Sequence, residues 1–192
     1  MASPHKIVSS EAEELILVDS QDREIGYLAK SECHNGGGIL HRAFSVFLFD
    51  NQGRLLLQRR ARGKRLWPGY WSNSCCSHPR RGETMQVATR RRLRDELNIS
   101  SELRFVYKFE YQADFGALGA EHELCHVYLG KVTGDVRANE NEIDALAYLN
   151  AVEVEQALLL RPDEFTPWFK MEWQTLRGEH AGMLDEYLSP GH

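Results

Sequence analysis

The alternation of apolar and polar positions predicts strands over the first third of the chain. Short apolar segments at residues 14–19 and 24–29 are bounded by polar residues, and we expect them to pair as strands. A glycine-rich loop follows at residues 35–38. The strongest β pattern runs over residues 41–49 and returns at residues 54–59 after a turn rich in Asp, Asn and Gly. This arrangement predicts a hairpin.

The periodicity becomes helical at residues 83–97, where apolar side chains can share one face. Strands and helices then mix without a strict βαβ alternation, so we predict an α+β fold, a mixed β-sheet sandwich flanked by helices. No linker divides the chain, so we expect a single domain over residues 1–192, with about 1–10 and 189–192 flexible. The later elements are three strands and two closing helices, at residues 104–112, 124–131, 145–149, 151–160 and 165–188.

Composition narrows the class of protein. A length of 192 residues suits one domain with a real core, and 42% hydrophobic residues are ordinary for a soluble protein. No stretch approaches about 18 uncharged apolar residues, so we expect no membrane insertion. The first ten residues hold no apolar run, which makes a secretory signal unexpected and predicts a cytoplasmic location.

The charges point to a small anionic ligand. A net charge of −5 argues against nucleic acid as a partner, and we expect a monomer. The positive charge is nevertheless concentrated locally, which suits a small anion better than a long polyanion, although each cluster alone is more typical of solvated surface charge. The clusters are Arg59, Arg60, Arg62, Lys64 and Arg65, then Arg80 and Arg81, then Arg90, Arg91, Arg92 and Arg94.

Four cysteines, Cys33, Cys75, Cys76 and Cys125, are present without a secretory signal. A disulfide framework is therefore disfavoured, and thiol chemistry or metal binding is favoured. Their spacing leaves open a metal site made of Cys33 and His34 with Cys75, Cys76 and His78.

Histidines and carboxylates offer a second metal site. His34 and His41 flank the glycine-rich loop, and His78 follows the cysteine pair. Glu121 and Glu123 would project from the same face of a strand, because side chains at i and i+2 share a side. Such a mixed nitrogen and oxygen site suits Mn²⁺, Mg²⁺ or Zn²⁺. A single loop histidine, by contrast, is most often a surface residue.

Arg92 and Glu96 lie one turn apart on the predicted helix. An intrahelical salt bridge is the simplest interpretation. The alternative is that Glu96 holds Mg²⁺ shared with a diphosphate while Arg92, Arg60 and Lys64 contact phosphate oxygens.

Two sets of motifs resemble a known family. Residues 83–99 resemble a degenerate Nudix box, with Ser77 where a glycine is expected and Arg91–Arg92 in place of Arg–Glu. A pyrophosphohydrolase needs more carboxylates on this helix, so the departure weakens a hydrolase function. The more specific resemblance is to type I isopentenyl-diphosphate isomerases. It rests on HRAFS at residues 41–45, WSNSCCSHP at 71–79 with Ser72 replacing Thr, Tyr111, EHELC at 121–125 and TPWF at 166–169.

This resemblance implies a Nudix-like fold and interconversion of isopentenyl and dimethylallyl diphosphate in isoprenoid biosynthesis. Cys76 and Glu123 would move protons on opposite faces of the substrate, passing through a tertiary carbocation. Tyr111 would support Glu123, and Trp168, which would otherwise suit a core position, would line the cavity over the hydrocarbon. The resemblance also implies a metal set of His34, His41, His78, Glu121 and Glu123, a Mg²⁺ at Glu96, and a diphosphate set of Lys30, Arg60, Lys64, Ser77 and Arg92.

Two other functions remain as alternatives. A Nudix hydrolase of a nucleoside diphosphate derivative would explain the helix and the basic clusters but leaves Cys76, His78 and the Glu121–Glu123 pair without a role. A non-enzymatic domain that binds diphosphates would bind such a ligand without exchanging its protons.

Overall fold

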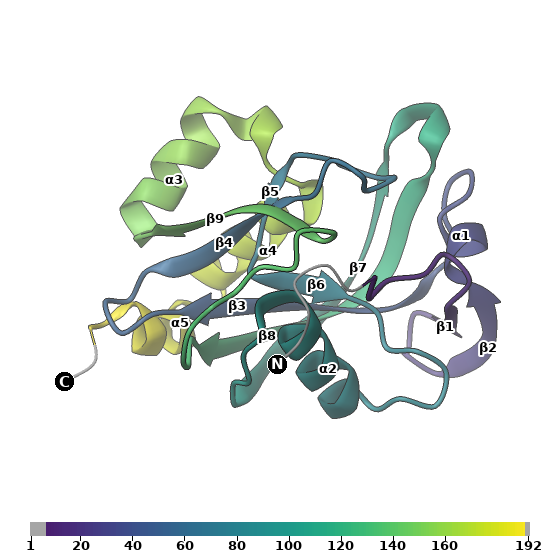
Figure 1. The fold of residues 1–192 in the computed structure, drawn as a ribbon, viewed down its shortest axis with the longest axis horizontal. Coiled ribbons are helices and arrows are strands. Elements are labelled where there is room, and N and C mark those ends of the chain that lie inside the picture. The colour runs from purple at the N-terminus through teal and green to yellow at the C-terminus, as the bar shows by residue number, and fades with distance from the viewer. Residues whose placement is uncertain (1–6, 191–192) are drawn as a thin grey trace.

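A mixed nine-stranded sheet with helices on both faces makes up the protein (Figure 1), which confirms the predicted α+β class. The computed structural model describes residues 7–190. The strands are β1 (Glu14–Val18), β2 (Glu24–Ala29), β3 (His41–Phe49), β4 (Leu55–Arg60), β5 (Trp71–Ser72), β6 (Cys75–Ser77), β7 (Leu103–Asp114), β8 (Ala120–Lys131) and β9 (Ile143–Leu149). The helices are α1 (Lys30–Cys33), α2 (Met85–Leu97), α3 (Ala151–Leu160), α4 (Pro167–Gly178) and α5 (Ala181–Leu188), with 3₁₀ turns at Gly116–Leu118 and Pro162–Glu164.

Strand β3 lies at the centre of the sheet. It runs parallel to β8 from the His41–Glu123 pair to the Phe49–Lys131 pair, and its other edge pairs antiparallel with β6. The predicted hairpin between residues 41–49 and 54–59 is wrong beyond one pair, because β3 and β4 pair only at Phe49 and Leu55. β4 instead takes β9 and β5 as neighbours, since both edges of β3 are already occupied.

Apolar residues along β3 are buried on both faces of the sheet, which explains its nearly continuous hydrophobic sequence. Phe47 and its neighbours at alternate positions pack against α4, whereas Phe44 and Val46 pack in a second core with Leu93 and Leu97 of α2. His41 of β3 and Glu123 of β8 are register partners on the α4 side of the sheet, as are Ala43 and Cys125 two residues on, whereas α2 on the other face carries Arg92 and Glu96.

Several element boundaries differ from prediction. Helix α2 begins after Thr84, whose side chain accepts a hydrogen bond from Val87 N, so Glu83 lies outside it. The predicted single helix over residues 165–188 is wrong: α4 ends at Gly178, and α5 starts after His180. Helix α1 and strands β5 and β6 are too short to produce a detectable periodicity.

The sequence predicted flexible ends at about residues 1–10 and 189–192. Of these, residues 1–6 and 191–192 lie outside the described residues. Val8, within the first range, is buried and its carbonyl accepts a hydrogen bond from Arg92 Nη1. No helix described within residues 7–190 is long and apolar enough to cross a membrane.

Candidate active site

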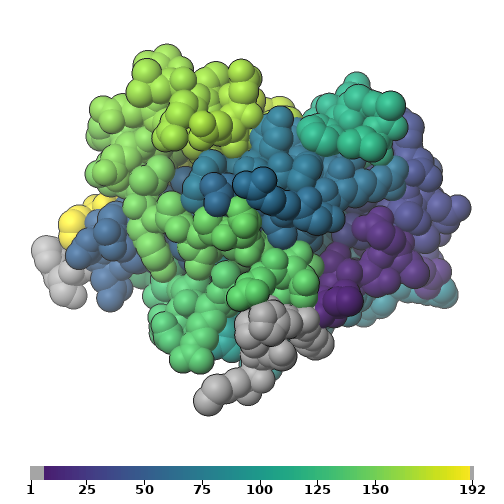
Figure 2. Space-filling model, turned by 45° about the horizontal axis from the view of Figure 1, so that its top comes forward, coloured from purple at the N-terminus to yellow at the C-terminus, as the bar shows by residue number. Residues whose placement is uncertain are grey.

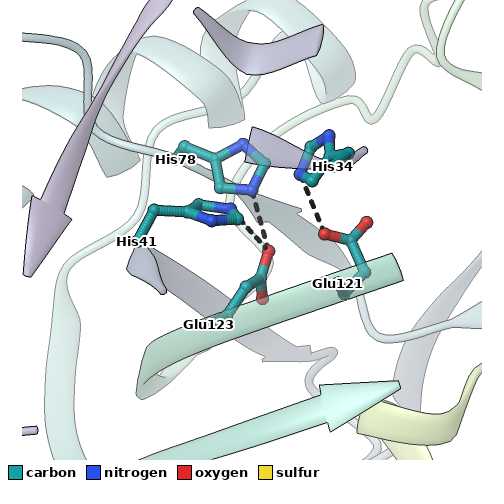
Figure 3. Close-up of side chains that lie close together, drawn as sticks. All are labelled: His34, His41, His78, Glu121 and Glu123. Atoms are coloured by element: carbon teal, nitrogen blue, oxygen red, sulfur yellow. Dashed lines mark hydrogen bonds and ion pairs between the residues drawn. The ribbon is translucent and has the colours of Figure 1, made fainter. Parts of the chain in front are cut away.

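Three histidines and two glutamates converge at one end of the β3–β8 pair (Figure 3). Each contributes a ligand atom that lies within 4.8 Å of the others. The residues come from four places in the chain, so the tertiary fold and not local sequence assembles them. They are His34 after α1, His41 at the start of β3, His78 after β6, and Glu121 and Glu123 on β8.

The contacts within this cluster fit a divalent cation. His34 Nε2 lies 2.9 Å from Glu121 Oε2, and His78 Nε2 lies 2.8 Å from Glu123 Oε1. His41 Nδ1 lies 2.7 Å from the carbonyl of Ile39, a pairing that directs Nε2 toward the cluster. Among the described residues, the buried His41 Nε2 has no hydrogen-bond partner, and Glu123 Oε1 lies 3.8 Å from it. A buried polar atom of this kind needs a partner, and a metal ion supplies one.

The alternative cysteine-containing set is not assembled. Cys75 faces the opposite side of the sheet and packs in the α2 core, away from His34 and His78. Within residues 7–190, the His/Glu cluster is the group found with metal-site geometry.

Burial sets the protonation of the cluster. It lowers the pKa of His41 to about 3 and, together with the nearby His34, holds the pKa of His78 well below its ordinary value. Burial and the adjacent Glu121 raise the pKa of Glu123 to about 7. Burial opposes ionisation of Glu121 as well, but His34 holds the pKa of that carboxyl below its usual range. Neutral imidazoles such as His41 and His78 have the lone pairs that a metal requires, whereas the neighbouring Glu121 raises the pKa of His34 despite its burial.

A cavity of about 620 Å³, counted with its opening to solvent, lies beside the cluster. Glu96 is not among its lining residues, and neither is His41, which is fully buried beneath it. The other predicted site residues line it: Lys30, His34, Arg60, Lys64, Cys76, Ser77, His78, Arg92, Tyr111, Glu121, Glu123 and Trp168.

The loop between β4 and β5 borders this cavity. In Figure 2 the blue surface of this part of the chain lies beside the teal tip of the β7–β8 hairpin. Arg65 joins them: its Nη2 donates to the carbonyl of Leu118 at 2.8 Å and to Asn35 Oδ1 at 2.7 Å. Arg65 belongs to a basic cluster that the sequence had shown, although its lining position had not been predicted.

Two of the basic side chains predicted to bind a diphosphate already have protein partners. Lys30 Nζ donates to Ser9 Oγ at 2.7 Å. Arg60 donates to the carbonyls of Leu66 and Trp67 and lies over the Trp168 ring, 5.3 Å from its centroid. These contacts hold Lys30 and Arg60 at the lining of the cavity, where together with Lys64 and Arg92 they form what we call its positive wall.

Arg92 and Glu96 form the intrahelical ion pair that was the simplest interpretation of their spacing. Arg92 Nε donates to Glu96 Oε1 at 2.8 Å, and both side chains are buried. Arg92 Nη2 also lies 3.2 Å from Glu142 Oε2, and Glu142 pairs with Lys64. Glu142 was missed because it lies in an irregular segment between predicted strands.

Cys76, Trp168 and Tyr111 surround the inner end of the cavity. Ser72 Oγ accepts a hydrogen bond from Trp168 Nε1 at 2.9 Å and lies 3.9 Å from Cys76 Sγ. Tyr111 Oη donates to Glu123 Oε2 at 2.6 Å. Burial raises the pKa of the Cys76 thiol to about 12, with Arg60 acting against it, so the sulfur is held as a protonated thiol.

Glu172 of α4 is a second residue that the sequence did not reveal. It is fully buried one helical turn after Trp168, and Cys125 Sγ donates to its Oε1 at 3.5 Å. The sequence did carry one signal, a charged residue on the apolar face of a helix. Other charged residues in the same helix make this signal difficult to recognise.

Comparison with known proteins identifies related sequences. Residues 39–169 match the model of the NUDIX domain. The chain is 40% identical over 174 residues to "Isopentenyl-diphosphate Delta-isomerase 1" of Photorhabdus laumondii, covering 90% of this chain and 99% of that protein. It is 43% identical over 157 residues to "Isopentenyl-diphosphate Delta-isomerase" of Serratia proteamaculans, covering 82% of this chain and 87% of that protein.

Solved structures share the fold. A crystal structure of a Deinococcus radiodurans protein superposes with a TM-score of 0.64 at 22% identity, covering 91% of this chain and 98% of the other. The MutT protein of Methanosarcina mazei gives a TM-score of 0.59 at 15% identity, covering 73% and 95%. At these identities the likeness is one of fold.

Proposed function

The chain belongs to the isopentenyl-diphosphate Delta-isomerases of the NUDIX superfamily, and from this premise we propose how its residues carry out the reaction. The enzyme interconverts isopentenyl diphosphate and dimethylallyl diphosphate. The observation that carries the residue assignment is that Cys76, Glu123 and Trp168 line one cavity, beside a wall of positive side chains.

Two groups that can exchange protons are needed, because an alkene carbon must gain a proton and a different carbon must lose one. Cys76 lies on β6 and Glu123 on β8, and β3 separates the two strands. The two groups therefore approach the cavity from different sides. One donates a proton to the alkene, giving a tertiary carbocation, and the other accepts a proton from the neighbouring carbon, so the proton count balances.

Trp168 and Tyr111 assist these groups. The indole of Trp168 presents a π face that stabilises a carbocation, worth about 2 kcal/mol when water is excluded. The hydrogen bond from its Nε1 to Ser72 fixes the ring. Tyr111 orients the Glu123 carboxyl through the hydrogen bond to Oε2.

The His/Glu cluster and Glu96 are proposed as the places for divalent ions. His34, His41, His78, Glu121 and Glu123 would hold Mn²⁺, Mg²⁺ or Zn²⁺, which when bound tunes the proton affinity of Glu123. Glu96 would hold a Mg²⁺ that offsets the charge of the diphosphate, and this requires its ion pair with Arg92 to loosen.

The diphosphate is proposed to bind along the positive wall of the cavity. Lys30 of α1, Arg60 of β4 and Lys64 of the loop after β4 line it, and Arg92 reaches it from α2. Ser77 lines the same region, where its backbone or hydroxyl can contact a phosphate oxygen. We further propose that the chain acts as a single domain, as a monomer and in the cytoplasm.

Incubation with isopentenyl diphosphate and Mg²⁺ in deuterated water tests the proposal. We expect dimethylallyl diphosphate to form with deuterium at the exchanged carbons, observed by NMR. An unchanged substrate would contradict the isomerase function. Release of phosphate or of a nucleoside monophosphate from nucleoside diphosphate derivatives would instead support a hydrolase.

A further inference from the structure

Glu142 holds two of the cations proposed to bind the diphosphate. Its carboxylate forms a close ion pair with Lys64 Nζ, and its Oε2 lies 3.2 Å from Arg92 Nη2. The Glu142 side chain is only 4% exposed, so solvent screens these contacts weakly. It does not line the cavity, whereas Lys64 and Arg92 do. Glu142 therefore contacts the two cations without being part of the cavity lining.

The backbone around Glu142 joins the elements that carry these cations. Asn139 N donates to the carbonyl of Glu96 in α2 at 2.8 Å, and Glu142 N donates to the carbonyl of Asn139 at 2.9 Å. Ala61 N donates to the carbonyl of Glu142 at 2.9 Å, three residues before Lys64. The segment thus fixes the loop that carries Lys64 against the helix that carries Arg92.

The buried charges balance one another. Lys64 and Arg92 supply two positive charges, and Glu96 and Glu142 supply two negative charges. Burial lowers the pKa of Lys64, whereas Lys64 and Arg92 together hold the pKa of Glu142 below its usual range despite its burial. This neutral group of four adds little to the attraction that Lys30 and Arg60 exert on a diphosphate, so the positive charge of an accompanying Mg²⁺ contributes more to binding.

We infer that Glu142 is a positioning residue of the diphosphate subsite, which orients Lys64 and Arg92 and makes diphosphate binding depend on Mg²⁺. The inference rests on the proposed function, since it takes the positive wall as the diphosphate site. Glu142 acts through the two cations and does not touch the ligand.

Calorimetric binding of inorganic diphosphate to the full chain, with and without added Mg²⁺, tests the role of Glu142. In the Glu142→Gln variant the neutral amide no longer offsets Lys64 and Arg92. Without added Mg²⁺ we expect this variant to bind diphosphate about tenfold more tightly than the parent, because removing one buried charge of the same sign strengthens attraction. We also expect added Mg²⁺ to raise the affinity of this variant for diphosphate less than it raises that of the parent, by a similar factor.

Glu155→Gln is the matched control, because it removes one negative charge from a distant ion pair with Arg177. It should bind diphosphate as the parent does. Glu142→Asp retains the charge and should retain the parent's Mg²⁺ dependence. This variant can be measured even if Glu142→Gln does not fold. Equal Mg²⁺-free affinity of a folded Glu142→Gln and the parent would overturn the inference, as would loss of the Mg²⁺ dependence in Glu142→Asp. If the parent itself fails to bind diphosphate with Mg²⁺, the proposed site fails instead.

Discussion

Tyr111 Oη donates a hydrogen bond to Glu123 Oε2 at 2.6 Å, joining two residues that lie directly opposite each other in the β7–β8 register. Both are buried, and the other oxygen of Glu123 faces His78. The phenol thus fixes one carboxylate oxygen while the imidazole contacts the other. A carboxyl that exchanges a proton with a substrate carbon needs this orientation, because proton transfer depends on alignment.

Tyr111→Phe should lower kcat about tenfold with little change in KM, since the lost hydrogen bond orients Glu123 and binds no phosphate. The hydrogen bond favours ionised Glu123, so its loss should raise the pKa of that carboxyl and move the dependent limb of the kcat profile to higher pH. Steady-state rates across pH measure both effects. Tyr107→Phe on the same strand is the control, and an equal loss in both variants would contradict a specific role for Tyr111.

Cys76→Ala should abolish isomerisation, because no other thiol lines the cavity among the described residues. The fold should remain, since alanine fits the space. Cys75→Ala should keep most of the activity, because the Cys75 side chain packs in the α2 core on the opposite side of the sheet. Deuterium incorporation followed by NMR measures the activity, and circular dichroism checks folding. A Cys76→Ala enzyme that isomerises at the parent rate would remove Cys76 from the mechanism.

The sequence predicted most elements because their periodicity is strong and their ends carry turn residues. It failed for the hairpin at β3 and β4, since pairing partners such as β8 and β9 are distant in the chain and local turn chemistry does not reveal them. It failed again at the α4–α5 junction, where His180 interrupts a pattern that is helical on both sides.

Some residues of the candidate site could likewise be predicted from the sequence, and others could not. His34 and Glu121 could be proposed from residue type and motif, and the structure brings them to 2.9 Å. Glu142 and Glu172 could not, because their significance comes from partners in other elements. A glutamate beside Lys64 has no local signature, and the contact of Glu172 with Cys125 is likewise created only by the tertiary fold.

Glu121→Gln should weaken metal binding at the His/Glu cluster, because it replaces an anionic ligand with a neutral amide. We expect the purified parent to retain a divalent ion and this variant to lose most of it, measured as metal per chain by mass spectrometry after gel filtration. The melting temperature should fall with the metal, since a ligand that binds the folded state stabilises it. His122→Asn is the neighbouring control, because His122 turns away and pairs with Glu110 at 3.2 Å. Equal metal content in Glu121→Gln and the parent would count against this cluster.

Glu172 should make the stability of the fold depend on pH. Burial raises its pKa to about 8, against the hydrogen bonds from Ser45 and Cys125. A carboxyl whose pKa is higher in the folded state stabilises the fold fully below its unfolded pKa of about 4.5, and this contribution is lost as the pH rises through about 8. Glu172→Gln keeps the shape and cannot ionise. Relative to the parent, it should therefore gain about 3 kcal/mol in free energy of unfolding between pH 5 and pH 8. Denaturant unfolding at both pH values measures this, with the exposed Glu179→Gln as the control. A constant difference between parent and Glu172→Gln across this range would show that Glu172 does not change its protonation on unfolding.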